Sequence, residues 1–229
     1  MGDRAGTSGL LLVDKPAGMT SHDVVDVARR AYGERSIGHL GTLDPFATGL
    51  LVLLFGRSTR LATFIENEPK QYEATFAFGS ETDTDDVTGE TTGTAPLPQR
   101  ERVLEAIAQL TGEIEQIPPA YSAKKVAGRV AYDAAREGAP LTLAPARVTV
   151  ERWDVRALGD ETLDATITCG GGTYIRALAR DLGRLSGSAA HLTALRRTRS
   201  GEFDVADAVP LDALRVSPPP LRRLRIVVE

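Results

Sequence analysis

Segments with strand periodicity and segments with helix periodicity follow one another along the 229 residues, which indicates a mixed fold. Four segments have the apolar run or the alternation that is typical of strands: residues 10–13, 70–78, 147–155 and 162–169. The last of these places Cys169 on an apolar face, so we expect it to be a core residue. The longest apolar run, residues 50–55, indicates a further buried element.

Helices are predicted where apolar residues recur every three or four positions. Thr20 and Asp23 have the spacing of a capping box, and the helix that they begin should end at Gly33. Further helices are expected over residues 56–64, 100–111 and 132–136 and from residue 175 onward. The first of these would place Arg57 and Arg60 one turn apart, either on an exposed face or within reach of a phosphate.

Composition limits the class of protein. Hydrophobic residues make up 42% and charged residues 25% of the chain, which is ordinary for a globular protein. The longest apolar run is far too short to span a bilayer, so we expect no membrane partner. One cysteine excludes an intramolecular disulfide, and three scattered histidines give no zinc-ligand spacing. A cytoplasmic protein is therefore expected.

The net charge of −4 argues mildly against a nucleic-acid partner, because phosphate binding favours basic surfaces. The charges are unevenly distributed, however, and residues 81–90 hold five carboxylates and no base. Basic side chains form three small clusters, which are either solvated surface or parts of one basic face: Lys124, Lys125 and Arg129; Arg196, Arg197 and Arg199; Arg222, Arg223 and Arg225.

Two segments resemble ligand-binding loops only in part. Residues 82–89 alternate carboxylates and hydroxyls, but the calcium-binding pattern needs a glutamate where Gly93 or Thr94 falls. The glycine triplet 170–172 precedes a helix, yet it has neither the Walker pattern nor the dinucleotide fingerprint. We therefore expect no metal site and no nucleotide cofactor.

Residues 38–49 contain the strongest candidate chemistry, with three glycines, one proline, one histidine and one carboxylate. Pro45 fixes its own φ and keeps Asp44 out of the helical region. An Asp-Pro pair is often no more than a turn opener. A carboxylate on a stiff loop beside a buried element also has the defined position that a catalytic acid, base or nucleophile requires.

This stretch resembles the active-site segment of the tRNA pseudouridine synthase B (TruB) family, whose catalytic aspartate falls on Asp44. Four further words resemble motifs of the same family: Asp-Lys-Pro-x-Gly-x-Thr-Ser at 14–21, Pro-x-x-Tyr-Ser-Ala-x-Lys at 118–125, Gly-Thr-Tyr-Ile-Arg at 172–176 and Leu-Arg-Arg at 195–197. The resemblance covers roughly residues 10–214. It implies an α/β (α+β) fold with a mixed, largely antiparallel sheet, flanking helices and a central RNA-binding cleft.

The resemblance also implies that Asp44, Tyr72 and Arg176 are catalytic. Asp44 would attack the sugar, attack the ring or remove a sugar proton, and Arg176 would pair with it and keep it ionised. Tyr72 would pack on the uracil face and help remove a ring proton, although a tyrosine at a strand start is otherwise a core residue. Substrate or RNA contacts are expected from six residues: His39, Tyr174, Leu195, Asp86, Lys125 and Arg60.

Two of these expectations are more specific. Tyr174 and Leu195 would close the base pocket. His39 would fill the gap that a flipped base leaves in the RNA stack, or else be a turn residue that bonds the adjacent backbone.

The activity that the resemblance implies is isomerisation of the T-loop uridine of tRNA, at position 55, to pseudouridine. The base is detached, rotated and rejoined through carbon, so no cofactor is expected. The uridine must first be extruded from the folded loop. The expected partner is the T stem-loop of tRNA, bound by a monomer.

We expect a flexible lead over residues 1–9, a catalytic domain over 10–214 with an RNA-clasping insertion at about 117–146, and a short Pro-rich, basic tail over 215–229 without a complete PUA domain. Many members of the family carry that domain. Two other classes stay open, namely a non-catalytic RNA-binding or RNA-folding protein and an RNA-guided synthase of the archaeal and eukaryotic type. The latter would be expected to have more basic extensions and the missing C-terminal domain.

Overall fold

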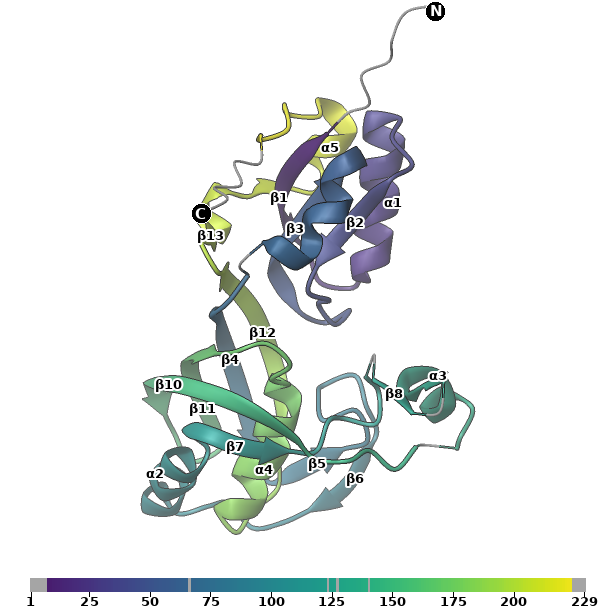
Figure 1. Cartoon of the computed structure of the whole chain (residues 1–229). Helices are drawn as coiled ribbons and strands as arrows, with labels where there is room; N and C mark the ends of the chain where they lie inside the picture. The colour runs from purple at the N-terminus through teal and green to yellow at the C-terminus, as the bar shows by residue number, and fades with distance from the viewer. Residues whose placement is uncertain (1–7, 66, 123, 127, 140, 224–229) are drawn as a thin grey trace, which may run out of the picture. The chain divides into compact units, whose positions relative to one another are not determined.

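The computed structural model describes residues 8–65, 67–122, 124–126, 128–139 and 141–223. The expected flexible lead lies almost wholly outside these residues, as do Arg225 and three positions of the predicted insertion. The chain forms two compact units (Figure 1). The first unit comprises Met1–Lys70 and Arg196–Glu229, and the second comprises Gln71–Leu195.

The sheet of the first unit has the strand order β14-β1-β3-β12, with β2 also paired to β3 and β13 to β12. Its strands are β1 (Gly9–Lys15), β2 (Ile37–Leu40), β3 (Thr48–Phe55), β13 (Phe203–Asp204), β14 (Val209–Pro210) and the second half of β12 (Ala190–Ser200). The β1–β3, β2–β3 and β12–β13 pairs are antiparallel, whereas β1–β14 and β3–β12 are parallel.

Both faces of β1 and β3 are buried, which explains their continuous apolar runs. One face packs against helix α1 (Ser21–Tyr32) and contributes Leu11 and Leu53 to the core. The other face contributes Leu12 and Val52 to a second apolar cluster. The predicted strand at 10–13 and the buried element at 50–55 are therefore confirmed.

Helix α1 begins and ends where the sequence predicts. Thr20 and Asp23 form the expected capping box, and Gly33 ends the helix in the left-handed conformation. The helix predicted over 56–64 is present as the 3₁₀ helix η1 (Gly56–Phe64). Two short helical segments follow later in the chain, η2 (Val205–Asp207) and α5 (Ala213–Val216). Beyond α5, Arg222 pairs with Leu10 of β1 through two backbone hydrogen bonds of 2.9 Å.

The sheet of the second unit has the strand order β12-β4-β11-β10-β7. Its strands are β4 (Lys70–Phe78), β7 (Gly112–Gln116), β10 (Ala146–Leu158), β11 (Thr162–Cys169) and the first half of β12. Two hairpins lie outside this sheet: β5 (Ser80–Thr82) with β6 (Thr91–Thr94), and β8 (Lys125–Val126) with β9 (Arg129–Val130).

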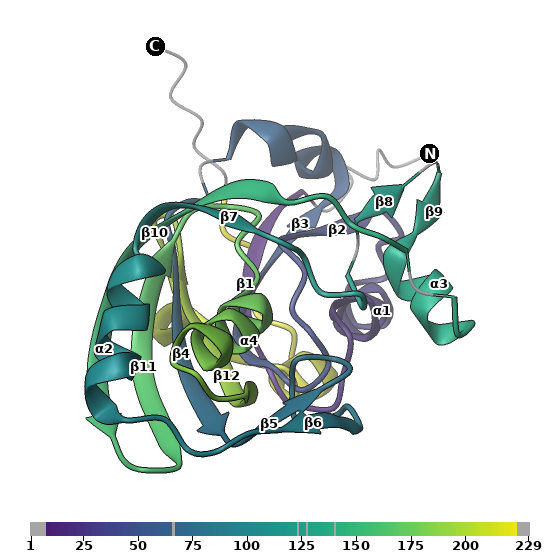
Figure 2. The same ribbon diagram turned by 90° about the horizontal axis from the view of Figure 1, so that it is seen from below.

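Three helices belong to the second unit: α2 (Arg100–Gln109), α3 (Ala131–Arg136) and α4 (Ile175–Leu185). Figure 2 shows α4 lying across the strands of this unit, and α2 contacts α4. The helices predicted at 100–111, at 132–136 and from 175 are thus confirmed.

The alternation in β4 is confirmed as well, since its apolar side chains from Tyr72 to Phe78 are buried. Cys169 on β11 has no exposed surface and is a core residue, as predicted. Strands β2, β7 and β12 and the β5–β6 hairpin were not predicted. The expected α/β class with a mixed, largely antiparallel sheet is confirmed, whereas the central RNA-binding cleft stays a prediction. In the part of the chain that the structure describes, every helix is too short or too polar to cross a membrane.

A substitution at Gly49 tests how closely β3 packs against β12. It has a φ of +100°, and a Cβ there would overlap the carbonyl oxygen of Arg197. We expect Gly49→Ala to lower the free energy of unfolding by about 3 kcal/mol, because steric overlap adds to backbone strain. Gly33→Ala is the matched control, with a φ of +63° and open space around the new Cβ, and it should cost only about 1 kcal/mol. Equal losses in chemical denaturation would contradict this packing.

Candidate active site

The loop between β2 and β3 carries Asp44 in the first unit. The carbonyl of Asp44 accepts a hydrogen bond of 3.1 Å from the backbone of Ala47, which closes a turn around Pro45. The turn-opener interpretation of the Asp-Pro pair is therefore confirmed, and the side chain of Asp44 is half-buried. A turn and a catalytic position are compatible, because the turn fixes the backbone that presents the carboxylate.

A buried lysine holds this turn from one side. Lys15 has no exposed surface, and its Nζ donates to the carbonyls of Met19 at 2.6 Å, Pro16 at 2.9 Å and Pro45 at 3.3 Å. The hydroxyl of Ser21 bonds the preceding residue of the loop, accepting from the amide of Leu43 at 2.9 Å and donating to its carbonyl at 3.1 Å. The backbone on both sides of Asp44 is thus tied to the segment 15–21.

A buried arginine holds the two ends of the same loop. Arg197 is 1% exposed, its Nε donates to the carbonyl of Leu50 at 2.8 Å, and its Nη2 donates to the carbonyl of Gly41 at 3.0 Å. Gly41 has a φ of +68°, which a residue with a side chain rarely adopts. Arg197 therefore holds the backbone on both sides of the loop, at Gly41 just after β2 and at Leu50 in β3.

Burial also sets the electrostatics of this loop. Desolvation lowers the pKa of Lys15 to about 8, with Arg197 lowering it further and the carboxylates of Asp44 and Asp23 opposing the change. Lys15 is consequently still charged at neutral pH, and an ammonium group is held within the field of Asp44.

His39 lies in β2, opposite Leu53 of β3, and not in a turn. Its Nδ1 is buried and has no hydrogen-bond partner among the described residues. The alternative of a turn histidine is wrong, because the residue lies in a strand. Burial, together with the charges of Arg197 and His22, lowers the pKa of His39. The ring is therefore neutral at physiological pH, and its contact with RNA stays a prediction.

Arg57 and Arg60 are both exposed on η1. A 3₁₀ helix has three residues per turn, so these two side chains stand one above the other. The exposed-face interpretation is confirmed, and a phosphate contact of Arg60 stays a prediction.

In the second unit, Tyr72 is 8% exposed and shares the buried face of β4 with Ala74 and Phe76. Tyr72 is therefore part of the core, and its contact with uracil stays a prediction. Leu195 on β12 is likewise buried, at 7% exposure. Lys125 is exposed on the β8–β9 hairpin, as are Lys124 and Arg129.

The start of α4 is fixed by a buried glutamine that the sequence did not single out. Gln116 is 1% exposed, its Nε2 donates to the carbonyl of Tyr174 at 3.1 Å, and its Oε1 accepts from the amide of Tyr174 at 2.8 Å. Tyr174 is the residue that precedes α4. This double hydrogen bond sets the backbone from which Tyr174 and Arg176 project.

Arg176 is 3% exposed and connects two loops of the second unit. Its Nη1 donates to the carbonyl of Thr84 and its Nη2 to the carbonyl of Tyr121, both at 2.8 Å. Its Nε lies 3.6 Å from Oδ2 of Asp86, in a pair whose side chains are almost completely buried. The structure thus brings together Arg176 and Asp86, two of the predicted site residues.

Asp86 closes the loop 82–89 on itself. Its Oδ1 accepts from the hydroxyl of Thr84 at 2.9 Å and from the amide of Thr88 at 2.9 Å, while Oδ2 faces Arg176. These oxygens are occupied by protein donors, which explains the alternating carboxylates and hydroxyls without a cation. Across the described residues no group of three or more metal-ligating side chains occurs.

Three arginines spaced four residues apart on α4 pair with the acidic segment. After Arg176, Nη1 of Arg180 lies 3.1 Å from Asp85, and Arg184 makes two bonds of 2.8 Å to Glu81. Burial raises the pKa of Asp85 to about 6, although Arg180, Arg176 and Arg184 act in the opposite direction. The run of carboxylates at 81–90 is thus largely balanced by one face of a helix.

The basic cluster at 196–199 is not a solvated surface as a whole. Arg196 makes a two-pronged ion pair with Asp14, at 3.0 and 2.7 Å, and Arg197 is buried beneath the Asp44 loop. Arg199 lies 3.7 Å from Asp204. These side chains therefore have mainly structural roles. The motif segments 14–21 and 195–197 contain Asp14, Arg196 and Arg197 partly for that reason.

The predicted site residues are divided between the units. Asp44, His39 and Arg60 belong to the first unit, and the other six belong to the second: Tyr72, Arg176, Tyr174, Leu195, Asp86 and Lys125. The expected pair of Asp44 with Arg176 joins residues of different units and stays a prediction. In each unit the main catalytic candidate, Asp44 or Arg176, lies on backbone that buried polar side chains hold in place. A carboxylate held as Asp44 is can act as a base or as a nucleophile.

Two family models match the chain. One is described as TruB family pseudouridylate synthase (N terminal domain) and matches residues 29–175. The other is described as tRNA pseudouridylate synthase B C-terminal domain and matches residues 176–217.

Curated relatives align with nearly the whole chain. A protein of Mycobacterium sp. (strain KMS) named tRNA pseudouridine synthase B is 49% identical over 216 residues, which cover 92% of this chain and 73% of the relative. A protein of the same name from Corynebacterium aurimucosum is 48% identical over 224 residues, which cover 95% of this chain and 75% of the relative.

Solved structures share the fold. A chain in the crystal structure of a Cbf5-Nop10-Gar1 complex matches with a TM-score of 0.69 and 27% identity, over 90% of this chain and 53% of that one. A chain of the archaeal box H/ACA sRNP Nop10-Cbf5 complex matches with a TM-score of 0.66 and 25% identity, over 91% and 53%. This chain spans about half the length of each.

The raised pKa of Asp85 predicts that its contribution to the free energy of unfolding depends on pH. Its pKa is raised to about 6 in the folded protein, so between about pH 4 and pH 6 the folded state binds more protons than the unfolded chain. The contribution of this group to the free energy of unfolding is therefore present below about pH 4 and declines as the pH rises to about 6.

Asp85→Asn removes this titration, and asparagine tolerates the positive φ of the position, 59°. Between about pH 4 and pH 7 the stability of the variant relative to wild type should improve by on the order of 2 kcal/mol. Urea denaturation of both proteins at the two pH values measures this change. A difference that does not vary with pH would mean that Asp85 has an ordinary pKa.

Proposed function

This chain belongs to the TruB family of pseudouridylate synthases, and on that premise we propose that it isomerises the T-loop uridine of tRNA to pseudouridine. The observation that carries the proposal is the way the Asp44 loop is held. Buried Lys15 and Arg197 bond the backbone of the loop, while the carboxylate of Asp44 stays half-buried. The curated relatives, which bear the name tRNA pseudouridine synthase B at 49% and 48% identity, support tRNA as the substrate.

The reaction is an internal rearrangement. The bond between the sugar carbon C1′ and ring nitrogen N1 breaks, the base turns, and a bond forms between C1′ and ring carbon C5. C5 then loses its proton and N1 gains one, so atoms and electrons balance without an oxidant, a reductant or a group donor. We propose no cofactor for this step.

Asp44 acts on the extruded nucleotide, as a nucleophile at the sugar or the ring or as a base at the sugar. Arg176 is proposed to pair with Asp44, which favours its ionised form. Tyr72 is proposed to lie on the uracil face and to assist removal of the C5 proton. Tyr174 and Leu195 are proposed to close the base pocket, and His39 to fill the gap in the RNA stack.

The basic residues that would contact RNA lie on exposed elements. Lys125 belongs to the β8–β9 hairpin and Arg60 to η1, and both side chains are exposed. Since the chain as a whole has a net charge of −4, binding depends on such local groups. We propose the T stem-loop of tRNA as the bound element and a monomer as the active form. One buried cysteine suits the reducing cytoplasm.

Two alternatives are ranked lower on particular observations. A non-catalytic RNA-binding protein has little use for a carboxylate held in this way beside a buried ammonium group. An RNA-guided synthase would resemble the Cbf5 structures, yet the chain matches those at 27% and 25% identity and the curated tRNA enzymes at nearly 50%.

Asp44→Asn tests the catalytic assignment. The substitution keeps the size of the side chain and removes its charge and basicity, so folding and RNA binding should persist while turnover is lost. We expect release of the uracil C5 hydrogen from labelled tRNA to fall by at least about a thousandfold. Thermal melting and RNA affinity serve as controls, and turnover close to that of wild type would show that Asp44 is not the catalytic carboxylate.

Neutralising Lys124, Lys125 and Arg129 to glutamine tests the basic hairpin. Each phosphate contact that is lost removes about one unit from the slope of log affinity against log salt. We therefore expect weaker tRNA binding and a shallower salt dependence in a titration series. Arg102→Gln on α2 is the control, since that side chain is also exposed, and a salt slope unchanged in the triple variant would exclude the hairpin from RNA contact.

A further inference from the structure

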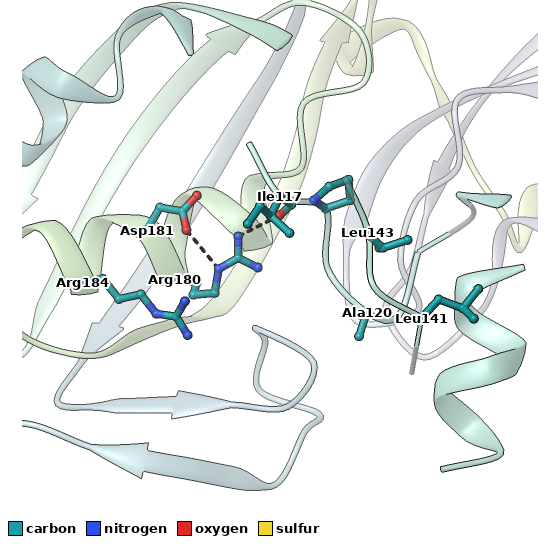
Figure 3. Close-up of a pocket in the computed structure, with 8 residues that line it drawn as sticks. Ile117, Ala120, Leu141, Leu143, Arg180, Asp181 and Arg184 are labelled. Atoms are coloured by element: carbon teal, nitrogen blue, oxygen red, sulfur yellow. Dashed lines mark hydrogen bonds and ion pairs between the residues drawn. The ribbon is translucent and has the colours of Figure 1, made fainter. Parts of the chain in front are cut away.

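The segment from Ile117 to Tyr121 is attached to α4 at both ends by arginines. Nη2 of Arg180 donates to the carbonyl of Ile117 at 2.8 Å, and Nη2 of Arg176 donates to the carbonyl of Tyr121 at 2.8 Å (Figure 3 shows the first bond). The two arginines lie four residues apart, about one turn of α4. Pro118 and Pro119 lie between the two carbonyls and have no amide hydrogen to donate, so the arginines supply polar anchors that the segment itself lacks.

This segment is the root of the basic β8–β9 hairpin. The carbonyl of Ser122 accepts from the amide of Tyr132 at 3.0 Å, and the carbonyl of Lys124 accepts from the amide of Ala131 at 2.8 Å. The ring of Tyr121 meets that of Tyr132 edge-on, with centroids 5.9 Å apart. A displacement of the root would therefore be transmitted to the exposed cations of the hairpin.

Arg180 is oriented by two carboxylates. Its Nη1 lies 3.1 Å from Oδ2 of Asp85, and its Nε lies 3.0 Å from Oδ1 of Asp181. The side chains of Arg180 and Asp85 are 11% and 10% exposed. A buried ion pair is weak evidence for stability, because desolvation offsets its attraction. It does fix the plane of the guanidinium, and with it the direction of the donor that holds Ile117.

The buried Pro118 and Pro119 pack the root into the protein, but its side that faces Arg180 is open. A cavity of about 290 Å³ lies there, lined by Ile117, by Leu141 and Leu143 from the returning end of the insertion, and by Arg180 and Arg184 (Figure 3). Because there is space on this side of the segment, loss of the hydrogen bond from Arg180 would let the Ile117 end of the root shift, while Arg176 still holds the Tyr121 end.

We propose that Arg180 is a positioning residue for tRNA binding, which sets the place of the basic hairpin by holding the carbonyl of Ile117. The proposal rests on the proposed function, because it assumes that the hairpin contacts the substrate. Arg180 acts through the backbone of the insertion and not on the reacting nucleotide. Its loss therefore impairs binding of tRNA and spares the chemical step.

Steady-state kinetics of the full chain with tRNA tests the proposal. Arg180→Ala should raise KM about tenfold, the effect of losing a hydrogen bond from a charged donor, and change kcat by less than about twofold. Arg180→Lys keeps the buried positive charge, but one compact ammonium group cannot serve both carboxylates and the carbonyl. It should fold like wild type and still raise KM, so it replaces the alanine variant if that one does not fold.

Arg184→Ala is the matched control. Arg184 lies one turn further along α4 and pairs with Glu81 in the same acidic segment, and its Nε and Nη2 both donate to that carboxylate. Its loss should leave KM within about twofold of wild type. An equal rise in KM for Arg184→Ala, or a fall in kcat at unchanged KM for the Arg180 variants, would overturn the proposal.

Amide hydrogen exchange separates this proposal from the proposed function. The amides of Ala120, Tyr121 and Ser122 should exchange faster in the Arg180 variants than in wild type or in Arg184→Ala. If wild type forms no pseudouridine, the proposed function fails and the exchange data still test the root. Unchanged exchange in the Arg180 variants would overturn the positioning role.

Discussion

Buried cations that hold backbone carbonyls are the interaction on which both units depend. In the first unit Lys15 and Arg197 bind the carbonyls of Pro45, Gly41 and Leu50 around the aspartate loop. In the second unit Arg176 and Arg180 do the same for the loop at 84 and for the segment 117–121. Many loop carbonyls have no backbone donor within their own loop, and a guanidinium offers several donors in a fixed geometry. These hydrogen bonds hold the irregular backbone of the loops in place, as ladder hydrogen bonds do for a strand.

The sequence was sufficient for elements whose pattern is local. The capping box at Thr20 predicted α1, the alternation over 70–78 predicted β4, and the five motif words indicated the family. Strand β2 was missed because three of its four residues lie inside the glycine-rich segment 38–49 and show no alternation. Strand β12 was missed because its arginines suggested a surface, whereas Arg197 is buried by carbonyls from residues more than 140 positions away.

The same limit applied to the candidate site. The family resemblance indicated Asp44, Arg176 and Asp86, and the structure shows that Arg176 and Asp86 form a buried pair. No periodicity could indicate that Gln116 clamps Tyr174 or that Asp85 faces Arg180, since each contact joins segments more than 50 residues apart. The acidic run resembled a cation loop only in part. Its charges are mainly used inside the protein, by one face of α4.

The protein is acidic overall, and four of its cations hold loop carbonyls, namely Lys15, Arg176, Arg180 and Arg197. Exposed cations such as Lys125 and Arg60 are proposed to contact RNA. The proposed activity is tested by incubating the purified chain with a T stem-loop transcript alone and mapping pseudouridine by a base-specific chemical adduct. We expect one adduct, at the T-loop uridine, formed without guide RNA or cofactor. A transcript that gains no adduct, or gains one only when a guide RNA is added, would contradict it.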